Sequence, residues 1–270
     1  MCVLPLPNHL AVHRELNYGV VICKCLFDQI GAAAPQRCYD PQHGHPLGGG
    51  SHWSDGSRTS LARIRACIPG TVLATENTAE PYMDTIDAYL MGTVDLEDDV
   101  PALPAVYAGY TTWFGSPSDQ ADTPAAFRAY VLRDTLWGAQ PGWMGPWIFD
   151  GAHREQYETL MKCARLRLQY REFLVEGRLV GEVTNELTNP TFTVTWHNQV
   201  EREATLKSVT ALTWENRQGR CVTFVANLSD VRRSFAGTAA KDVRIACELA
   251  PGEVRVFAAN PSDKFQTKAY

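Results

Sequence analysis

The sequence predicts an α/β region followed by an all-β region: part of a (β/α)8 barrel of the TIM type, and then a small antiparallel β-sandwich. Over residues 1–176, short apolar runs alternate with segments of helical periodicity, a pattern typical of a parallel sheet or barrel. From Gly177 to residue 270 the pattern changes to short β runs separated by turns. In addition, Asp28 and Glu76 each follow an apolar run, as polar side chains do at the carboxyl ends of barrel strands.

The first elements follow from local signals. Residues 19–27 are apolar on both faces and predict a buried strand. A helix is expected over residues 58–67, where apolar residues recur at helical spacing until Pro69 and Gly70 end it. Residues 71–75 then predict a second strand.

The next elements repeat this alternation. Pro81 is placed to open a helix, because apolar residues follow it at intervals of three and four as far as Leu90. Residues 105–111 predict a third strand. Thr123 and Pro124 begin a helix that runs to about Leu136.

The last elements complete the α/β region and form the sandwich. Trp143 and Trp147 are expected in a last barrel strand and its loop, and residues 153–175 in a long helix. The inner side of this helix is expected to carry Tyr157, Leu160, Ala164 and Leu168. The β runs of the sandwich are LVGEV, FTVTWH, VTALTWEN, CVTFVANL, VRIACEL and EVRVFAA.

The α/β region is too short to form a complete eight-stranded barrel. A complete barrel takes about 250 residues, or about 200 at the least, and residues 1–176 hold about four strand–helix units. We therefore expect an open, partial sheet with an exposed edge near residues 20–27. The sandwich from about Gly177 should fold more normally.

Composition excludes some partners. The chain has 270 residues, 45% hydrophobic and 20% charged, as in an ordinary globular protein. A net charge of -5 gives no reason to expect nucleic acid or an acidic membrane surface as a partner. The apolar run GVVICKCLF is too short to span a bilayer, and the first residues lack the pattern of a signal peptide. Compartment and oligomeric state are not determined by these features.

The eight cysteines do not follow a zinc-binding spacing. Cys23 and Cys25 are separated by a single residue and no second pair follows, so we interpret them as small buried residues. An even number of cysteines permits disulfides, but a chain of this length does not need them. The redox compartment therefore stays open.

Asp28 and Glu76 are the candidate catalytic residues. Burial disfavours a charged carboxylate, so two of them at the ends of apolar strands need a reason to be there. Beside a loop rich in His, Gly and Trp, they suggest acid/base or nucleophilic chemistry at a barrel mouth. The structural alternative is that each carboxylate caps a loop or pairs with a basic side chain.

The strings FDQIG, HGHPLGGG and ATENTAEPY carry a family resemblance. They resemble a family of glycoside-hydrolase-like proteins described as a domain of unknown function, over most of residues 18–258. That family is similar to barrel enzymes of the endo-α-N-acetylgalactosaminidase and α-galactosidase type. The resemblance implies a retaining glycosidase-like site, with Asp28 as the nucleophile and Glu76 as the acid/base. In those enzymes the nucleophile closes the fourth strand, so the chain resembles the C-terminal part of a barrel plus its sandwich.

Further residues are candidates for contact with a carbohydrate substrate. Glu80 and Asp40 lie in or near the strings that carry the resemblance. His43 and His45 offer ring nitrogens that donate or accept hydrogen bonds, and we favour sugar recognition over a metal site because no matching acid was identified. We therefore predict no metal and no cofactor. Gly48 to Gly50 would allow positive φ or close approach of the backbone.

Trp53 and Trp113 are candidate platforms for a sugar ring, because both are expected in loops. The alternative is that each packs in a small core beneath its loop, since tryptophan is highly buried on average.

The functional hypothesis is hydrolysis of an α-linked galactose-type or N-acetylgalactosamine-type glycan by a retaining, metal-independent mechanism. One alternative is a noncatalytic carbohydrate-binding or interaction module derived from such an enzyme. Another is an inactive, truncated fragment of one. Fold and family alone do not supply the substrate.

Overall fold

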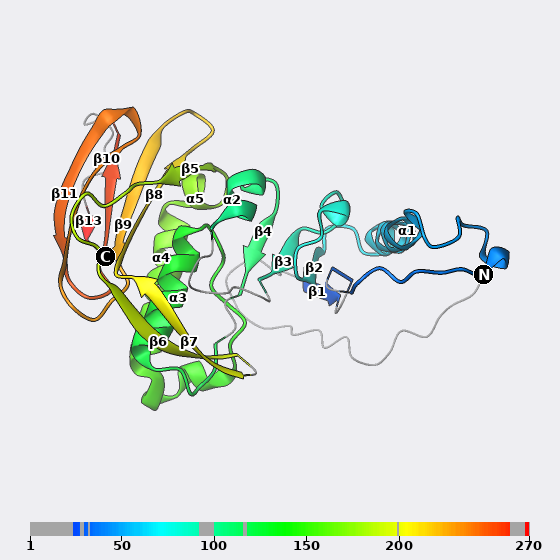
Figure 1. Cartoon of the computed structure of the whole chain (residues 1–270), viewed down its shortest axis with the longest axis horizontal. Coiled ribbons are helices and arrows are strands. Elements are labelled where there is room, and N and C mark those ends of the chain that lie inside the picture. Colours follow the sequence, from blue (N-terminus) through cyan, green and yellow to red (C-terminus); the bar gives the residue numbers. More distant parts are fainter. Residues whose placement is uncertain are drawn as a thin grey trace. The chain divides into compact units, whose positions relative to one another are not determined.

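The computed structural model describes residues 24–27, 30–31, 33–91, 100–115, 118–198, 200–259 and 268–269 (Figure 1). The chain divides into two compact units, Met1–Asp87 and Ala88–Tyr270.

The first unit is built on a parallel strand pair. Strand β1 (Lys24–Phe27) pairs with β2 (Val72–Glu76), and Phe27 lies opposite Thr75. Helix α1 (His52–Cys67) connects the two strands, after the short 3-10 helix η1 (Pro41–His43). This arrangement confirms the predicted strand–helix–strand order, although α1 begins at His52, six residues before the predicted start at Arg58. The predicted strand residues 19–23 lie outside the described residues.

The helix predicted from Pro81 is wrong. Only the short 3-10 helix η2 (Glu80–Tyr82) forms there, and the chain then extends into strand β3 (Ala88–Leu90), which begins the second unit. The reason is local pairing across the first unit: the Asp87 amide donates to the Leu73 carbonyl at 2.9 Å, and the Asp87 carboxylate accepts from the Leu73 amide at 2.8 Å. These bonds hold residue 87 extended beside β2.

The second unit begins with another parallel pair. Strand β3 pairs with β4 (Thr112–Phe114), with Tyr89 opposite Trp113. The strand predicted over residues 105–111 is wrong, because helix α2 (Ala102–Tyr107) runs into its first three residues and strand β4 begins only at Thr112. Its proline, Pro104, falls in the first turn of the helix, where a missing backbone N–H costs nothing.

The strand expected around Trp143 and Trp147 is also wrong. Only Gln140 bridges β4, donating from its amide to the Trp113 carbonyl at 2.8 Å. The 3-10 helix η3 (Pro146–Phe149) follows. Pro141 and Pro146 lack the N–H that a continued ladder needs.

Helix α3 (Pro124–Leu136) forms as predicted. The Thr123 hydroxyl caps it by accepting from the Ala126 amide at 3.2 Å. The helix expected over residues 153–175 is instead η4 (Gly151–His153), α4 (Arg154–Gln169) and α5 (Arg171–Leu174). None of the helices in the described ranges is long and apolar enough to cross a membrane.

The inner face predicted for the long helix is wrong in part. Leu160 does pack against the core, but Leu168 is 71% exposed, and the buried residues of α4 are Gln156, Cys163 and Leu166. Apolar residues occur on more than one side of α4, so the segments that pack against the helix decide which side is buried.

The β region has a five-stranded antiparallel sheet in the order β13-β12-β9-β8-β5. Two further antiparallel pairs are β6–β7 and β10–β11, the latter joined by η5 (Ala240–Asp242). All six predicted β runs form strands, and β7, β10 and β13 were not predicted. The strands are β5 (Arg178–Glu182), β6 (Thr191–Asn198), β7 (Val200–Lys207), β8 (Val209–Glu215), β9 (Cys221–Asn227), β10 (Arg233–Ala239), β11 (Val243–Leu249), β12 (Val254–Ala258) and β13 (Lys268–Ala269).

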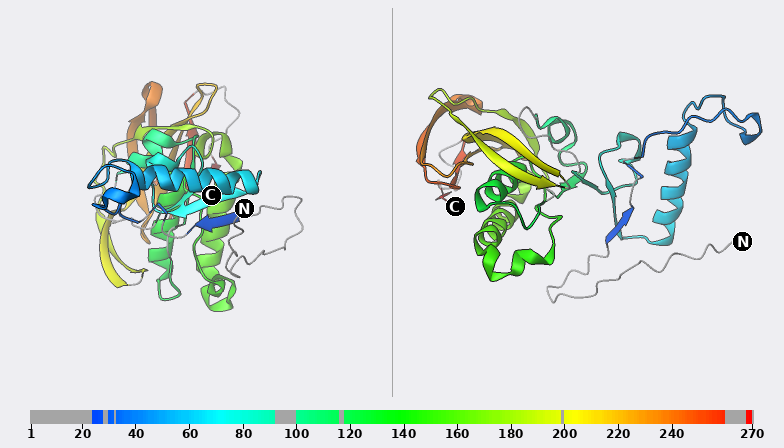
Figure 2. Two further views of the ribbon diagram at one scale, coloured as in Figure 1. Left: turned by 90° about the vertical axis from the view of Figure 1, so that its right-hand side faces the viewer. Right: turned by 60° about the horizontal axis from the view of Figure 1, so that its bottom comes forward.

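The five-stranded sheet is covered on both faces (Figures 1 and 2). Alternate residues of a strand point to opposite faces. Phe224 and Trp214 pack in a core shared with α3 and α4, whereas Val225 packs against β10 and β11. The Trp214 indole also donates to the Leu136 carbonyl at 2.9 Å. The predicted domain boundary at 176/177 therefore falls inside the second unit, across a continuous core.

Candidate functional site

Glu76 is the last residue of β2 and is half-buried. The next residue, Asn77, has a left-handed φ of 52°, so the chain turns directly after the strand. Side chains that end a parallel strand point toward the edge where barrel enzymes hold their catalytic groups. Glu76 therefore occupies the kind of position that the sequence predicted for it.

The segment after β1 is tied to this same strand end. The Thr75 hydroxyl donates to the Phe27 carbonyl at 2.8 Å and accepts from the Gly31 amide at 3.0 Å. A Cβ atom at Gly31 would lie 2.4 Å from the Glu76 carbonyl oxygen, so only glycine fits this approach. The chain on both sides of Asp28 is thus held at the end of β2, while Asp28 itself lies outside the described residues.

Three acidic residues follow Glu76, namely Glu80, Asp84 and Asp87, and two of them form ion pairs with α1. Glu80 begins η2 and is exposed. The Asp84 carboxylate accepts a hydrogen bond from the Arg58 guanidinium at 2.6 Å, which lowers the pKa of Asp84 below its ordinary value. Asp87 pairs with Arg65 of α1 and with the backbone of β2. Asp84 and Asp87 therefore attach neighbouring segments to one another.

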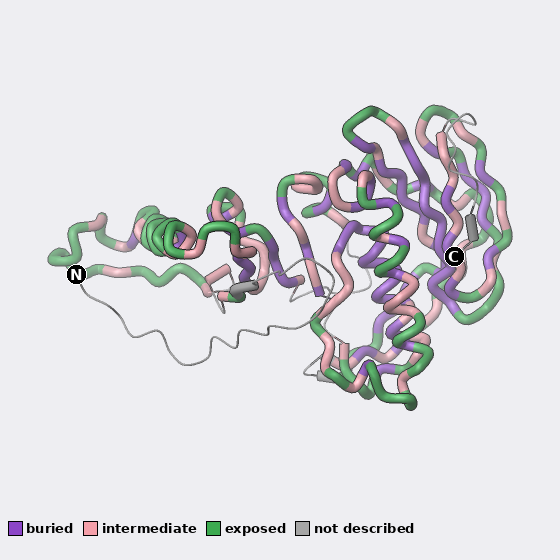
Figure 3. Tube along the Cα trace, turned by 180° about the vertical axis from the view of Figure 1, so that it is seen from behind, coloured by how far each residue is buried: buried purple, intermediate pink, exposed green. Residues whose placement is uncertain are grey.

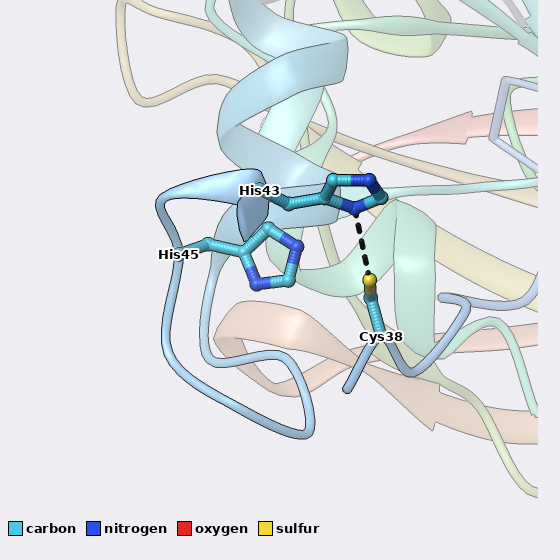
Figure 4. Close-up of side chains that lie close together, drawn as sticks. All are labelled: Cys38, His43 and His45. Carbon is cyan, nitrogen blue, oxygen red and sulfur yellow. Dashed lines mark hydrogen bonds between the residues drawn. The ribbon is translucent and has the colours of Figure 1, made fainter. Parts of the chain in front are cut away.

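Residues 38–50, called the histidine loop here, bring the side chains of Cys38, His43 and His45 together, as Figure 4 shows. The Cys38 Sγ atom lies 3.2 Å from His43 Nδ1, and His43 Nε2 lies 3.2 Å from an Asp40 carboxylate oxygen. His45 Nδ1 lies 3.0 Å from the Pro46 carbonyl. The structure therefore groups three predicted residues, Asp40, His43 and His45. Cys38 was not associated with them in the sequence, although it precedes His43 by only five positions.

Glycines shape this loop. Gly48, Gly49 and Gly50 have φ of 83°, 131° and 59°, a region that side chains with a Cβ rarely adopt. The Gly48 amide donates to the Cys38 carbonyl at 2.8 Å and closes the loop. The expectation that the glycines provide positive φ is confirmed, and the loop geometry is fixed by the backbone.

The two tryptophan platforms are not in loops. Trp53 lies in the first turn of α1 and is half-buried. Trp113 is the middle residue of β4 and is 3% exposed, so its ring presents no face to a sugar. The alternative interpretation as a packed residue therefore suits Trp113 better, since a large aromatic ring gains most from full burial.

The predicted site residues fall in both units. Trp113 belongs to the second unit. The others that the structure describes belong to the first unit: Asp40, His43, His45, Trp53, Glu76 and Glu80. Five cysteines whose side chains the structure describes are free thiols: Cys38, Cys67, Cys163, Cys221 and Cys247.

Comparison with known sequences agrees with the resemblance at family level. Residues 14–117 match the family model described as "Domain of unknown function (DUF6259)". A Bacteroides thetaiotaomicron protein named "Putative glycoside hydrolase" is 28% identical over 75% of this chain and 30% of its own length. A Monosiga brevicollis protein named "Putative glycoside hydrolase 22789" is 38% identical over 43% of this chain and 10% of its own length. The chain thus spans less than a third of either relative.

Solved structures show weaker likeness. A GH27 β-L-arabinopyranosidase from Geobacillus stearothermophilus aligns with 91% of this chain and 60% of its own at 11% identity, with a TM-score of 0.46. An α-amylase from Geobacillus thermoleovorans aligns with 77% of this chain and 57% of its own at 10% identity, with a TM-score of 0.48. Likenesses of this size do not establish a shared fold, and the partial barrel stays a prediction.

Proposed function

We propose that this chain carries the catalytic carboxylates of a glycoside hydrolase that acts by a retaining mechanism. The observation that carries the proposal is the parallel pairing of β1 with β2. Asp28 follows Phe27 in the sequence, and Glu76 ends the neighbouring strand, so both carboxylates come after adjacent parallel strands. The names of the two relatives support the same class of enzyme.

In this proposal Asp28 attacks the anomeric carbon of the sugar and forms a glycosyl ester, while Glu76 protonates the departing oxygen. Glu76 then takes a proton from water, which attacks the ester and releases Asp28. A proton donor in this role needs a partly desolvated position, and the half-buried Glu76 meets that requirement. The mechanism requires the two carboxyl groups to be about 5–5.5 Å apart.

The proposed substrate is a glycan with α-linked galactose or N-acetylgalactosamine. This narrower choice is supported by the sequence resemblance alone. The candidates for contact with sugar hydroxyls stay Asp40, His43, His45 and Glu80, and the half-buried Trp53 is the candidate for contact with a ring face. None of these residues takes part in bond making or breaking in this scheme.

The test is a comparison of substituted proteins on α-galactosides and α-N-acetylgalactosaminides. Asp28→Asn should abolish turnover and leave sugar binding largely intact. Glu76→Gln should slow substrates with poor leaving groups by about 10²–10⁴-fold, and slow activated aryl glycosides less, because only the former need the proton. Glu80→Gln, which changes a nearby exposed carboxylate, is the matched control for Glu76.

Two outcomes would contradict the proposal. Turnover by Asp28→Asn at the rate of the unsubstituted chain would exclude Asp28 as the nucleophile. Sugar binding without turnover in the unsubstituted chain, on every substrate of the panel, would favour the noncatalytic carbohydrate-binding module instead.

A further inference from the structure

Three potential metal ligands meet in the histidine loop. One ligand atom each from Cys38, His43 and His45 all lie within 4.8 Å of one another. In a tetrahedral zinc site, Zn–S and Zn–N bonds place sulfur and nitrogen about 3.6 Å apart. The separation of 3.2 Å between Cys38 Sγ and His43 Nδ1 is close to this value. A small rearrangement of side chains would therefore complete such a site.

The outer contacts of both rings favour ligation. Histidines that bind metals usually donate their other N–H to a carboxylate or to a backbone carbonyl. His43 Nε2 faces the Asp40 carboxylate at 3.2 Å, and His45 Nδ1 faces the Pro46 carbonyl at 3.0 Å. Donation to these two acceptors leaves the lone pair of His43 on Nδ1, beside the sulfur, and that of His45 on Nε2. Each ring thus has the kind of second partner that metal-binding histidines have.

The surrounding loop is fixed before any ion binds. Asp40 also accepts from the Gln42 amide at 2.8 Å, and this contact caps η1 and holds the carboxylate in place. The His45 ring stacks on His52 of α1 with centroids 4.2 Å apart, and His52 Nδ1 lies 2.7 Å from the Gly49 carbonyl. Ordered outer contacts reduce the entropy lost when an ion binds.

We propose that Cys38, His43 and His45 form a zinc site with three protein ligands. Thiolate and imidazole together suit Zn²⁺ better than the oxygen-binding ions Mg²⁺ or Ca²⁺. Binding forms a Zn–S bond and breaks the S–H bond of Cys38, whose proton passes to solvent. Three protein ligands leave the fourth tetrahedral position for water. None of the three zinc ligands is one of the two catalytic carboxylates of the proposed glycosidase, so zinc binding does not depend on that mechanism.

The first experiment titrates the metal-stripped full-length chain with Zn²⁺ by calorimetry. The unsubstituted chain should bind one ion at this site. Cys38→Ser should weaken binding by at least about 100-fold, and Asp40→Asn by about 10-fold, because outer partners typically contribute 10–100-fold. Cys67→Ser, which changes an exposed thiol in the same unit, is the matched control and should bind as before.

A second experiment needs no substitution and separates this cysteine from the seven others. The chain is alkylated with iodoacetamide with and without Zn²⁺, and the labelled positions are found by peptide mass spectrometry. Zinc should protect Cys38 and leave the labelling of exposed Cys67 unchanged. Equal affinity of Cys38→Ser and the unsubstituted chain, or equal labelling of Cys38 with and without saturating zinc, would overturn the proposal. Asp28→Asn and Glu76→Gln should bind zinc normally, which distinguishes this test from that of the proposed function.

Discussion

Helix α1 of the first unit and helix α3 of the second unit bury very different fractions of their residues. The structure describes every residue of α1 in the first unit, and Leu61 is the one buried residue among the 16 of this helix. In α3 of the second unit, ten of 13 residues are buried, because α4 and the large sheet pack against it. Figure 3 shows this contrast along the chain, with α1 mostly exposed. Different interactions therefore stabilise the two units.

In the first unit, these interactions are hydrogen bonds of loops and strand ends. Glu76, Asp40 and the two loop histidines are positioned by backbone turns, a threonine hydroxyl and glycines with positive φ. In the second unit even charged side chains are enclosed, as in the buried Arg133–Asp134 ion pair at 3.0 Å. Groups that must meet a substrate or an ion need access to solvent, so the more open unit is the better place for chemistry. The following tests measure this difference.

The largest effect is expected in the core of the second unit. Phe127 is fully buried in α3 and packs edge-to-face on Trp147, so Phe127→Ala should lower the free energy of unfolding by about 3–5 kcal/mol. Urea unfolding followed by circular dichroism measures this loss. Phe149→Ala removes a ring of the same size that is 77% exposed and is expected to change stability by less than about 0.5 kcal/mol. Equal losses in the two variants would contradict the assigned core.

The second largest effect is expected in the reactivity of cysteine thiols in the two units. Burial raises the pKa of Cys163 to about 12, and its side chain is fully buried, whereas Cys67 in α1 is exposed. Because the thiolate is the reactive form, Cys163 should react with an aromatic disulfide reagent at pH 8 at least about 10³-fold more slowly than Cys67. Timed labelling with peptide mass spectrometry measures both rates. Comparable rates would show that the second unit opens readily.

The smallest effect is expected at the surface of the first unit. The Arg58 guanidinium lowers the pKa of Asp84 below its ordinary value of 3.8. The pair therefore contributes stability above about pH 3.8, and this contribution is lost as the pH falls through the lowered pKa. Both side chains are about half exposed, so Asp84→Asn should cost only about 0.2–1 kcal/mol at pH 7, and less in high salt.

Hydrogen exchange of α1 peptides at neutral pH measures that loss. The difference in exchange between Asp84→Asn and the unsubstituted chain should disappear at low pH, because the Asp84 carboxyl group is then protonated and uncharged. A loss that persists in high salt would show that Asp84 acts by packing rather than by charge.

Local patterns in the sequence were sufficient for several elements. The apolar runs that became β1 and β2, the cap of Thr123 on α3, and all six predicted β runs depend on signals within a few residues. Glu76 at the end of β2 follows from the same kind of signal, because a strand that ends in an acid is visible in the sequence alone. The placement of Asp28, the barrel and the domain boundary at 176/177 stay predictions.

Other features were decided by tertiary contacts. Pairing of Asp87 with Leu73 replaced the predicted helix after Pro81 by an extended segment, and packing placed Trp113 inside rather than on the surface. The grouping of Cys38 with His43 and His45 depended on turns at glycines whose combined path no local pattern specifies. The sequence thus determined which segments could be strands or helices, since that preference is set by neighbouring residues. Tertiary structure decided which faces were buried and which side chains met, because those depend on contacts between distant segments.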